Sequence, residues 1–304
     1  MQKRLLVTGF GGFVAGSVVW QAAHSGAWDV LAVSHREPIH VPKGVTCVQA
    51  DLCDHARLRD IVHSVHPDAV IHAAAKADID YCQRHPAEAE SINAGVPGEL
   101  ARLCAETGAK LVHCSTDTVF DGKKGMYVET DAPHPLNAYA EAKVRAEEAV
   151  LNLAPNAVVA RLSLVMGLPV LGAGNSFLAR MLDDLEHDRP GKFLTNEVRT
   201  PLDVITAGRA LLELADNDFT GIIHLAGSTR GSRYDMACQI ARHLGYADSL
   251  IHPINLGAML GRAPRPPDAS LDNALAKTTL TTPMQTLLGG LDLVLRGTEE
   301  QQGQ

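Results

Sequence analysis

The chain has 304 residues, of which 46% are hydrophobic, and a formal net charge of −8. This composition excludes a disordered chain and allows a large core, so we expect one large domain with an appended lobe. The acidic balance, without repeats or interleaved basic and aromatic runs, excludes a typical nucleic-acid-binding surface.

The spacing of the cysteines and the length of the apolar segments indicate the cellular compartment of the protein. The cysteines form no Cys-x-x-Cys pair, which favours buried thiols in a reducing compartment over disulfides. The chain enters a strand directly, so we expect no signal peptide, and no apolar run reaches the length that spans a bilayer. We therefore expect a soluble, cytoplasmic protein without a membrane partner. The six cysteines are Cys47, Cys53, Cys82, Cys104, Cys114 and Cys238.

The first predicted strand, residues 4–8, leads into a glycine-rich turn and the start of a helix. Gly9 and Gly12 let the backbone approach a pyrophosphate closely, and the N–H groups of a helix start attract the anion. Ala15 is small enough for the third close-packing position. A glycine-rich run after a strand can also be a simple turn, so the following elements must decide. The cofactor contacts expected here are Gly9, Phe10, Gly12, Phe13 and Val14.

The second predicted strand, residues 28–34, ends in His35 and Arg36. A domain that binds NAD usually carries an acidic residue here for the ribose 2′-hydroxyl, and this chain has none. The guanidinium of Arg36 can instead pair with a 2′-phosphate, which favours NADPH over NADH. We expect His35 and Arg36 to bind the cofactor. The alternative is a surface arginine in a loop.

Strands and helices then alternate along the chain. Further strands are predicted over residues 45–49, 69–74, 110–115 and 157–164, with helices opening at 51–54 and running over 86–107 and 137–153. Continuous apolar strands separated by helices are typical of a parallel sheet covered on both faces. We therefore predict an α/β fold, a Rossmann-type doubly wound parallel sheet of about seven strands. Ligands of such sheets bind at the carboxyl ends of the strands.

Two stretches at these strand ends carry residues suited to carbonyl reduction. Thr116 leaves the fifth strand, and the next helix carries Tyr139 and Lys143 four residues apart, on one face. A tyrosine can protonate the alkoxide that forms as hydride arrives. A neighbouring ammonium stabilises the phenolate and lowers the pKa of the tyrosine from its ordinary value of about 10. Thr116 can hold the substrate oxygen between them. An exposed Tyr and Lys on a surface helix is the alternative.

Several motifs combine into one pattern: Thr8-Gly9-x-x-Gly12, Asp51-Leu52, His72-Ala73-Ala74-Ala75, Ser115-Thr116-Asp117-x-Val119-Phe120-Asp121-Gly122 and Glu129-Thr130-Asp131-x-Pro133-x-Pro135-x-Asn137-x-Tyr139-x-x-x-Lys143. With them the chain resembles the extended short-chain dehydrogenase/reductases, and within these the dTDP-4-dehydrorhamnose reductase group. The likeness continues through Arg161-Leu162-Ser163 and Arg199-Thr200-Pro201 and reaches weakly into residues 265–272. It therefore covers nearly the whole chain.

The resemblance implies roles for individual residues. Thr116, Tyr139 and Lys143 would form a catalytic triad, in which Tyr139 donates the proton and Lys143 also bonds the nicotinamide ribose. Asn93 matches an asparagine that helps to shape the active site in the superfamily, or is a polar helix residue without that role. The residues that would contact the adenine and the middle of the cofactor are Asp51, Leu52, Ala73, Ala74 and Ala75.

The substrate positions depart from the family pattern. Lys76, Thr118 and Leu164 stand where the rhamnose-type reductases often carry aromatic residues, so the sugar nucleotide need not be a dTDP-sugar. Lys76 is either an anion contact or a solvated charge. Arg199 and Arg265 are either diphosphate contacts or members of surface salt bridges. The candidate substrate-binding residues are Lys76, Asp117, Thr118, Arg199 and Arg265.

Metal binding and dehydration are disfavoured. Ser17 stands where some members carry an acidic residue associated with a metal, and His63 and His66 have no evident third ligand, so we predict no metal. Sugar-nucleotide dehydratases of this superfamily need an Asp-Glu pair after the threonine, and Thr118 occupies the Glu position.

We therefore predict an NADPH-dependent reductase of a keto group, with a nucleotide-linked 4-keto-deoxysugar as the favoured substrate. Two alternatives stay open. One is a non-catalytic NADP-binding regulatory subunit resembling that of methionine adenosyltransferase, and the other is an NAD-dependent sugar-nucleotide epimerase, which Arg36 disfavours. A homodimer is a candidate assembly, and we expect no nucleic-acid partner.

Beyond residue 165 the pattern changes. Residues 167–175 predict a flexible connection, followed by helices over 176–187, 204–215 and 232–244 and a short segment around Phe193. We assign residues 1–165 to the NADP(H)-binding domain, to which residues 203–228 return with a seventh strand over 221–226. Residues 166–304 are expected to form mainly a smaller C-terminal substrate lobe.

Overall fold

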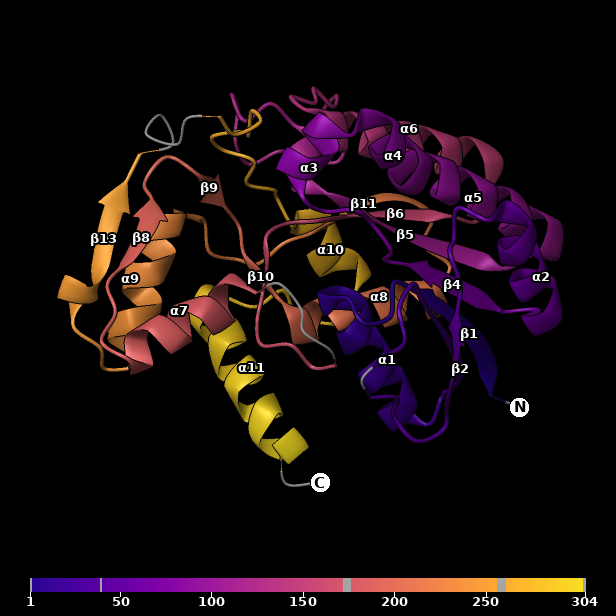
Figure 1. Ribbon diagram of the computed structural model, residues 1–304, viewed down its shortest axis with the longest axis horizontal. Helices are drawn as coiled ribbons and strands as arrows, with labels where there is room; N and C mark the ends of the chain where they lie inside the picture. The colour runs from indigo at the N-terminus through magenta and orange to yellow at the C-terminus, as the bar shows by residue number, and fades with distance from the viewer. Residues whose placement is uncertain (1, 39, 172–175, 256–260, 303–304) are drawn as a thin grey trace.

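The computed structural model describes residues 2–38, 40–171, 176–255 and 261–302 (Figure 1). Seven strands form one parallel sheet in the order β11-β6-β5-β4-β1-β2-β3. The order reverses between β1 and β4, the point at which open α/β sheets form a ligand crevice. The strands are β1 (Lys3–Thr8), β2 (Trp28–Ser34), β3 (Val45–Gln49), β4 (Ala69–His72), β5 (Lys110–Thr116), β6 (Val158–Leu162) and β11 (Gly221–Leu225).

Helices cover both faces of the sheet because its strands are apolar on both sides. Leu5 and Val7 of β1 pack in one core with α1 (Phe13–Ser25) and α8 (Val204–Asp216). Leu6 packs in a second core, on the other face, with three further helices. Figure 1 shows these two helical layers above and below the sheet. The helices of the second layer are α2 (His55–Val65), α5 (Val96–Thr107) and α6 (Ala138–Leu153).

Side chains of three neighbouring strands lie at one level near the carboxyl end of the sheet. Thr8 of β1 pairs in register with His72 of β4, which pairs with His113 of β5. All three residues are buried. A row of polar side chains therefore runs through the core beside the crevice.

A smaller lobe lies beside the sheet. It contains α7 (Phe177–Glu186), α9 (Arg233–His243) and α11 (Leu287–Gln302), together with the parallel pair β8 (Gly191–Leu194) and β13 (Ile251–Ile254). Its own apolar core includes residues such as Leu178 and Met236. Figure 1 shows this lobe on the left, next to the carboxyl ends of the strands.

Short elements connect the lobe and the sheet. Two small ladders join β7 (Val165–Met166) to β10 (Leu202–Asp203) and β9 (Val198–Arg199) to β12 (Gly231–Ser232). The short helix α10 (Ala274–Thr279) contacts the sheet core. Among the described helices, none combines the length and apolar character needed to cross a membrane.

The predicted seven-stranded parallel sheet is confirmed, including the return of the chain to form β11. Some boundaries differ from expectation. β4 and β6 end two residues earlier than predicted, and the segment around Phe193 is the strand β8. The long helix is interrupted, since α4 (Pro86–Glu90) and α5 flank a π-helical turn over Ser91–Gly95. Residues 172–175 of the expected flexible connection lie outside the described residues.

Candidate active site

The glycine-rich turn forms a tight cradle at the start of α1. Gly9 and Gly11 have φ values of +84° and +92°, which side chains rarely adopt. A Cβ atom on Gly9 would lie 2.7 Å from the backbone nitrogen of Ala74, and one on Gly12 would lie 2.9 Å from the Gly9 carbonyl oxygen. Because only glycine fits these positions, the turn leaves backbone and the N–H groups of α1 available to an anion. The geometry fits the pyrophosphate of a dinucleotide.

The other residues expected at the cofactor surround this cradle. Phe10 is buried, while Phe13 and Val14 begin α1 and are half-buried. His35 and Arg36 are exposed directly after β2, beside the cradle, where the backbone N–H groups of Gly9 and Phe10 bond the Val33 carbonyl. The strand ends thus gather the expected adenosine-side residues at one edge.

Residues after β3 and β4 complete this edge. Asp51 is exposed and accepts a hydrogen bond from the Cys53 backbone N–H at 2.9 Å, whereas Leu52 is buried in the core. Ala73 donates its backbone N–H to the Thr8 carbonyl at 3.3 Å. Ala74 is half-buried against Gly9, and Ala75 is exposed. All these residues lie at the carboxyl end of the sheet, as the sequence predicts.

Tyr139 and Lys143 lie one turn apart on α6 and are both buried, with Lys143 only 2% exposed. The Lys143 amine donates to the Cys114 carbonyl at 2.6 Å and lies 3.0 Å from Nε2 of His113. Burial lowers the pKa of Lys143 to about 8. The amine can therefore change its charge within the ordinary pH range.

Thr116 joins the pair from the end of β5. Its hydroxyl lies 3.0 Å from the Thr118 hydroxyl, and a hydrogen bond from Thr116 to Tyr139 lowers the pKa of the phenol. Burial, however, has the larger effect and raises the pKa of Tyr139 above its ordinary value, with the nearby Asp117 carboxylate acting in the same direction. The net shift of the Tyr139 pKa is therefore upward, opposite to the lowering expected from the Lys143 ammonium alone. The cause is the apolar packing of the phenol against Cys82 and Ala89.

Asn93 lies in the π-helical turn, a distortion that often marks functional positions. Its buried side-chain amide accepts a hydrogen bond from the Lys76 backbone N–H at 2.9 Å and donates to the Lys76 carbonyl at 3.2 Å. The asparagine thus fixes the loop that follows the alanine run. Its side chain has a specific structural partner next to the crevice.

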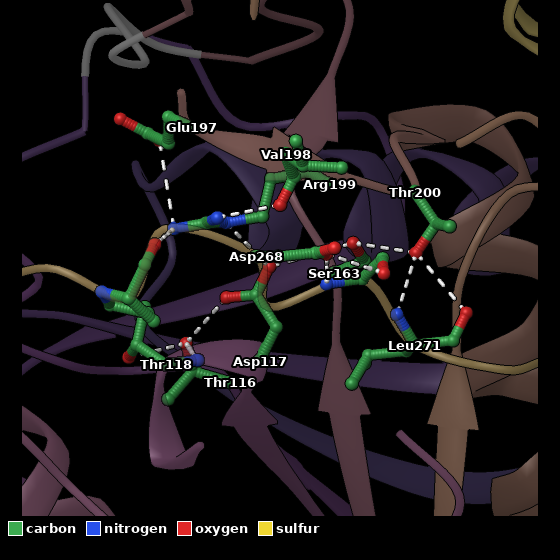
Figure 2. A network of polar contacts seen from close by, with 12 residues as sticks. Thr116, Asp117, Thr118, Ser163, Glu197, Val198, Arg199, Thr200, Asp268 and Leu271 are labelled. Atoms are coloured by element: carbon green, nitrogen blue, oxygen red, sulfur yellow. Dashed lines mark hydrogen bonds and ion pairs between the residues drawn. The ribbon is translucent and has the colours of Figure 1, made fainter. Parts of the chain in front are cut away.

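A network of buried charges joins the end of β5 to the segment around β9 (Figure 2). Arg199 is 4% exposed, and its Nε lies 3.3 Å from the Asp117 carboxylate. A further ion pair joins Arg199 to Glu197 at 3.7 Å, and Glu197 also pairs with Arg233 at 3.2 Å. Ser163 donates to Asp117 at 3.5 Å. Burial raises the pKa of Asp117, although Arg199 opposes this effect.

This network lines a pocket of about 600 Å³ between the sheet and the lobe. Apolar side chains such as Leu164, Phe177 and Phe193 form part of its wall. Basic side chains outnumber acidic ones in the wall. The basic residues are Arg180, Lys192, Arg199, Arg233, Arg262 and Arg265, and the acidic ones are Asp117, Asp184 and Glu197.

The structure brings four of the five expected substrate residues to this pocket: Asp117, Thr118, Arg199 and Arg265. Lys76 is not among the lining residues, and its amine lies 4.0 Å from the centre of the Tyr81 ring. Arg265 pairs with Asp80 through two contacts of 2.8 and 3.0 Å. Arg199 also donates to the Val198 and Pro266 carbonyls. Neither arginine belongs to a fully exposed surface salt bridge.

The sequence predicts no role for four residues at or next to the site: the pocket residues Glu197 and Arg233, Asp80, which pairs with the pocket residue Arg265, and His113, which contacts Lys143. Asp80 lies in the first turn of the unpredicted helix α3 (Ile79–Arg84), and its lowered pKa reflects hydrogen bonds from Arg265 and the Ala263 backbone. Glu197 and Arg233 meet only because β9 pairs with β12. The alternation of Glu197 and Arg199 was the one local signal. Among the described residues, no three His, Cys, Asp or Glu side chains gather as metal ligands would.

Comparisons with known proteins cover most of the chain. The RmlD substrate binding domain model matches residues 3–298. The chain is 31% identical over 282 residues to methionine adenosyltransferase 2 subunit beta of Bos taurus, which covers 91% of this chain and 82% of that protein. It is 32% identical over 289 residues to dTDP-4-dehydrorhamnose reductase of Mycobacterium tuberculosis, which covers 93% and 89%.

A solved structure shares the fold. The dTDP-4-dehydrorhamnose reductase of Bacillus anthracis, crystallised in complex with NADP, matches with a TM-score of 0.85 over 98% of this chain and 100% of that one. The two sequences are 21% identical, so this likeness concerns the fold alone.

Proposed function

Because the chain belongs to the RmlD substrate binding domain family, within the NAD(P)-dependent oxidoreductases of the extended short-chain type, we propose that it reduces a keto group with NADPH. The favoured substrate is a nucleotide-linked 4-keto-deoxysugar. The observation that carries the proposal is the burial of Tyr139 and Lys143 one turn apart on α6, with the Lys143 amine bonded to the Cys114 carbonyl of β5. The same chain carries a glycine cradle and a pocket with more basic than acidic side chains.

In this proposal Tyr139, Thr116 and Lys143 have different roles in the reduction. Tyr139 keeps its proton over the ordinary pH range because burial raises its pKa, so it can donate that proton to a substrate oxygen. Thr116, whose side chain acts on the Tyr139 phenol and lowers its pKa, would hold the same oxygen. Lys143 supplies a positive charge one helical turn away, which would stabilise the phenolate left behind. NADPH, when bound on the cradle, would supply the hydride.

The pocket supports an anionic substrate. Its basic side chains outnumber its acidic ones, and a nucleotide sugar carries a negatively charged diphosphate. The apolar wall from the lobe, including Phe177 and Phe193, provides surface for a base or sugar. The relative from M. tuberculosis is named dTDP-4-dehydrorhamnose reductase, which supports a nucleotide-sugar substrate here. In this proposal residues 1–165 mainly bind the cofactor and the lobe binds the substrate.

The test is NADPH oxidation with a panel of nucleotide-linked 4-keto sugars. We expect turnover with at least one of them and a loss of about 10²- to 10⁴-fold in the Tyr139→Phe variant, because only the proton donor is removed. NADPH binding by the variant, measured by fluorescence, serves as the control and should change little. Turnover that survives the substitution would refute the role of Tyr139.

A second candidate is a regulatory subunit, favoured by the 31% identity to methionine adenosyltransferase 2 subunit beta over 91% of the chain. In that case the protein would bind NADPH without oxidising it and would co-purify with a second enzyme. Affinity purification of the intact chain, followed by NADPH oxidation assays on the same sample, separates the two functions.

A further inference from the structure

The amine of Lys143 has an unusual second partner in the imidazole of His113. A lysine ammonium has three N–H donors and no acceptor. One donor bonds the Cys114 carbonyl at 2.6 Å, and a second points to Nε2 of His113 at 3.0 Å. Only one N–H remains for a ligand. His113 therefore limits and directs what the amine can contact.

The contact defines the chemical state of His113. An imidazole nitrogen that accepts from an ammonium must be unprotonated, so the proton of neutral His113 must lie on Nδ1. His113 is fully buried, and its pKa is held well below the ordinary value by burial and by the charge of Lys143. The ring should stay neutral wherever the protein is folded. It is a permanent acceptor.

The surroundings favour positioning over proton transfer. The His113 ring stacks on His72 with centroids 5.3 Å apart, and His72 is bonded to Thr8 at 2.6 Å. Within the described residues, however, Nδ1 of His113 and Nε2 of His72 have no hydrogen-bond partner. A proton that reached His113 would have no onward acceptor. The column of rings supports the amine without leading to solvent.

We propose that His113 is a positioning residue, whose neutral imidazole in the Nδ1–H tautomer holds the Lys143 amine at the end of β5 and stabilises its ammonium form. The test of this inference by enzyme activity rests on the proposed reductase function, whereas its test by NMR does not. Other groups also face the amine. Glu147 and Cys114 favour its charged form, while burial opposes it and lowers the pKa of Lys143 to about 8. Glu147 is itself bound by Ser115 and Arg161.

The first test needs neither cofactor nor substrate. Long-range proton–nitrogen NMR spectra of the labelled protein should show His113 as the Nδ1–H tautomer, neutral over the folded range. A nitrogen NMR titration of the Lys143 amine should give a pKa lower by about one unit in His113→Phe, because a hydrogen bond to the charged form is lost. An Nε2–H tautomer, or an unchanged Lys143 titration, would overturn the proposal.

The second test uses the pH profile of NADPH oxidation. In His113→Phe the loss of activity at high pH should begin about one unit lower than in the unchanged protein. In His113→Gln the amide oxygen can accept the same N–H, so the pH profile should return most of the way to that of the unchanged protein. His72→Phe is the matched control, because it alters the ring stack without touching the Lys143 amine. The pH at which its activity begins to fall should be the same as in the unchanged protein.

The two tests separate the two claims. A panel without any turnover, together with the expected NMR results, would refute the reductase and keep the role of His113. Turnover with equal pH shifts in His113→Phe, His113→Gln and His72→Phe would point to a general packing effect and overturn the role of His113.

Discussion

Two buried cations flank the crevice, and their partners differ. Lys143, on the sheet side, is held by a carbonyl and a neutral imidazole. Arg199, on the lobe side, is held by the carboxylates of Asp117 and Glu197 as well as by carbonyls. Burial lowers the pKa of Lys143 to about 8, whereas Arg199 is paired with two carboxylates.

The difference in partners indicates different roles for the two cations, one in proton transfer and one in holding the fold. A buried amine that has no ion pair among the described residues can gain or lose its charge as the pH changes, which suits a group that assists proton transfer. A charge neutralised by carboxylates from other segments stays fixed and ties those segments together. Asp117 follows β5, whereas Glu197 and Arg199 lie at β9, so this network joins the sheet to the lobe.

The largest expected effect comes from breaking the network. Arg199→Met should lower the free energy of unfolding by about 3–5 kcal/mol, because Asp117 would remain buried without its partner. Urea denaturation measures the change. Arg189→Met is the control, since Arg189 is about half exposed in its pairs with Asp183 and Asp184 and should cost about 1 kcal/mol or less. Equal losses in the two variants would contradict a structural role for the buried network.

The pH dependence of turnover tests the other half of the comparison. Because the pKa of Lys143 is lowered to about 8, its ammonium is lost as the pH rises through that value. Turnover should then fall about tenfold per pH unit. In Lys143→Arg the charge persists, so the fall above pH 8 should vanish even if the overall rate is lower. If turnover by Lys143→Arg falls above pH 8 as it does in the unchanged protein, the loss of activity at high pH belongs to the titration of another group.

A smaller effect is expected at Arg36, which is exposed directly after β2. Arg36→Ala should weaken NADPH about tenfold, through loss of a charged hydrogen bond to the 2′-phosphate, and leave NADH nearly unchanged. Fluorescence titration with both nucleotides measures this. Equal losses would remove Arg36 from the nucleotide preference.

The smallest effect is expected where the pocket wall is pinned by Asp80. Its side chain is 25% exposed and holds Arg265, while its carboxylate also accepts the Ala263 backbone N–H at 2.8 Å. Asp80→Asn should raise KM about fivefold and leave kcat unchanged, because a partly exposed ion pair contributes about 1 kcal/mol. Asp248→Asn, which removes the exposed pair with Arg242, is the control. A change in kcat with KM intact would contradict a role in substrate binding.

The sheet could be predicted closely because its signals are local. β2 and β3 have the predicted bounds, since each is a short apolar run that ends at polar residues. Helix α6 begins after the predicted Asn137, whose side chain caps it by accepting the Ala140 N–H. The motif residues Thr116, Tyr139 and Lys143 likewise come together because they follow one strand and its helix.

The rest depended on contacts between distant segments. The two-residue ladders of the lobe have no periodicity to detect, so the meeting of Glu197 with Arg233 could not be foreseen. The direction of the Tyr139 pKa shift also escaped prediction, because it is set by packing against Cys82 and Ala89. His113 lies in the strand before Thr116, but its contact with Lys143 joins β5 to α6 and has no signal in the local sequence.

The strand β11 comes from late in the sequence, and this position has a consequence for folding during synthesis. Residues 221–225 pair with β6, and α8, which covers the same face as α1, comes from residues 204–216. A fragment ending at residue 165 would leave the β6 edge and an apolar face bare, which invites aggregation. The ribosome must therefore release more than two-thirds of the polypeptide before the sheet can close, and truncations for expression should extend beyond Leu225.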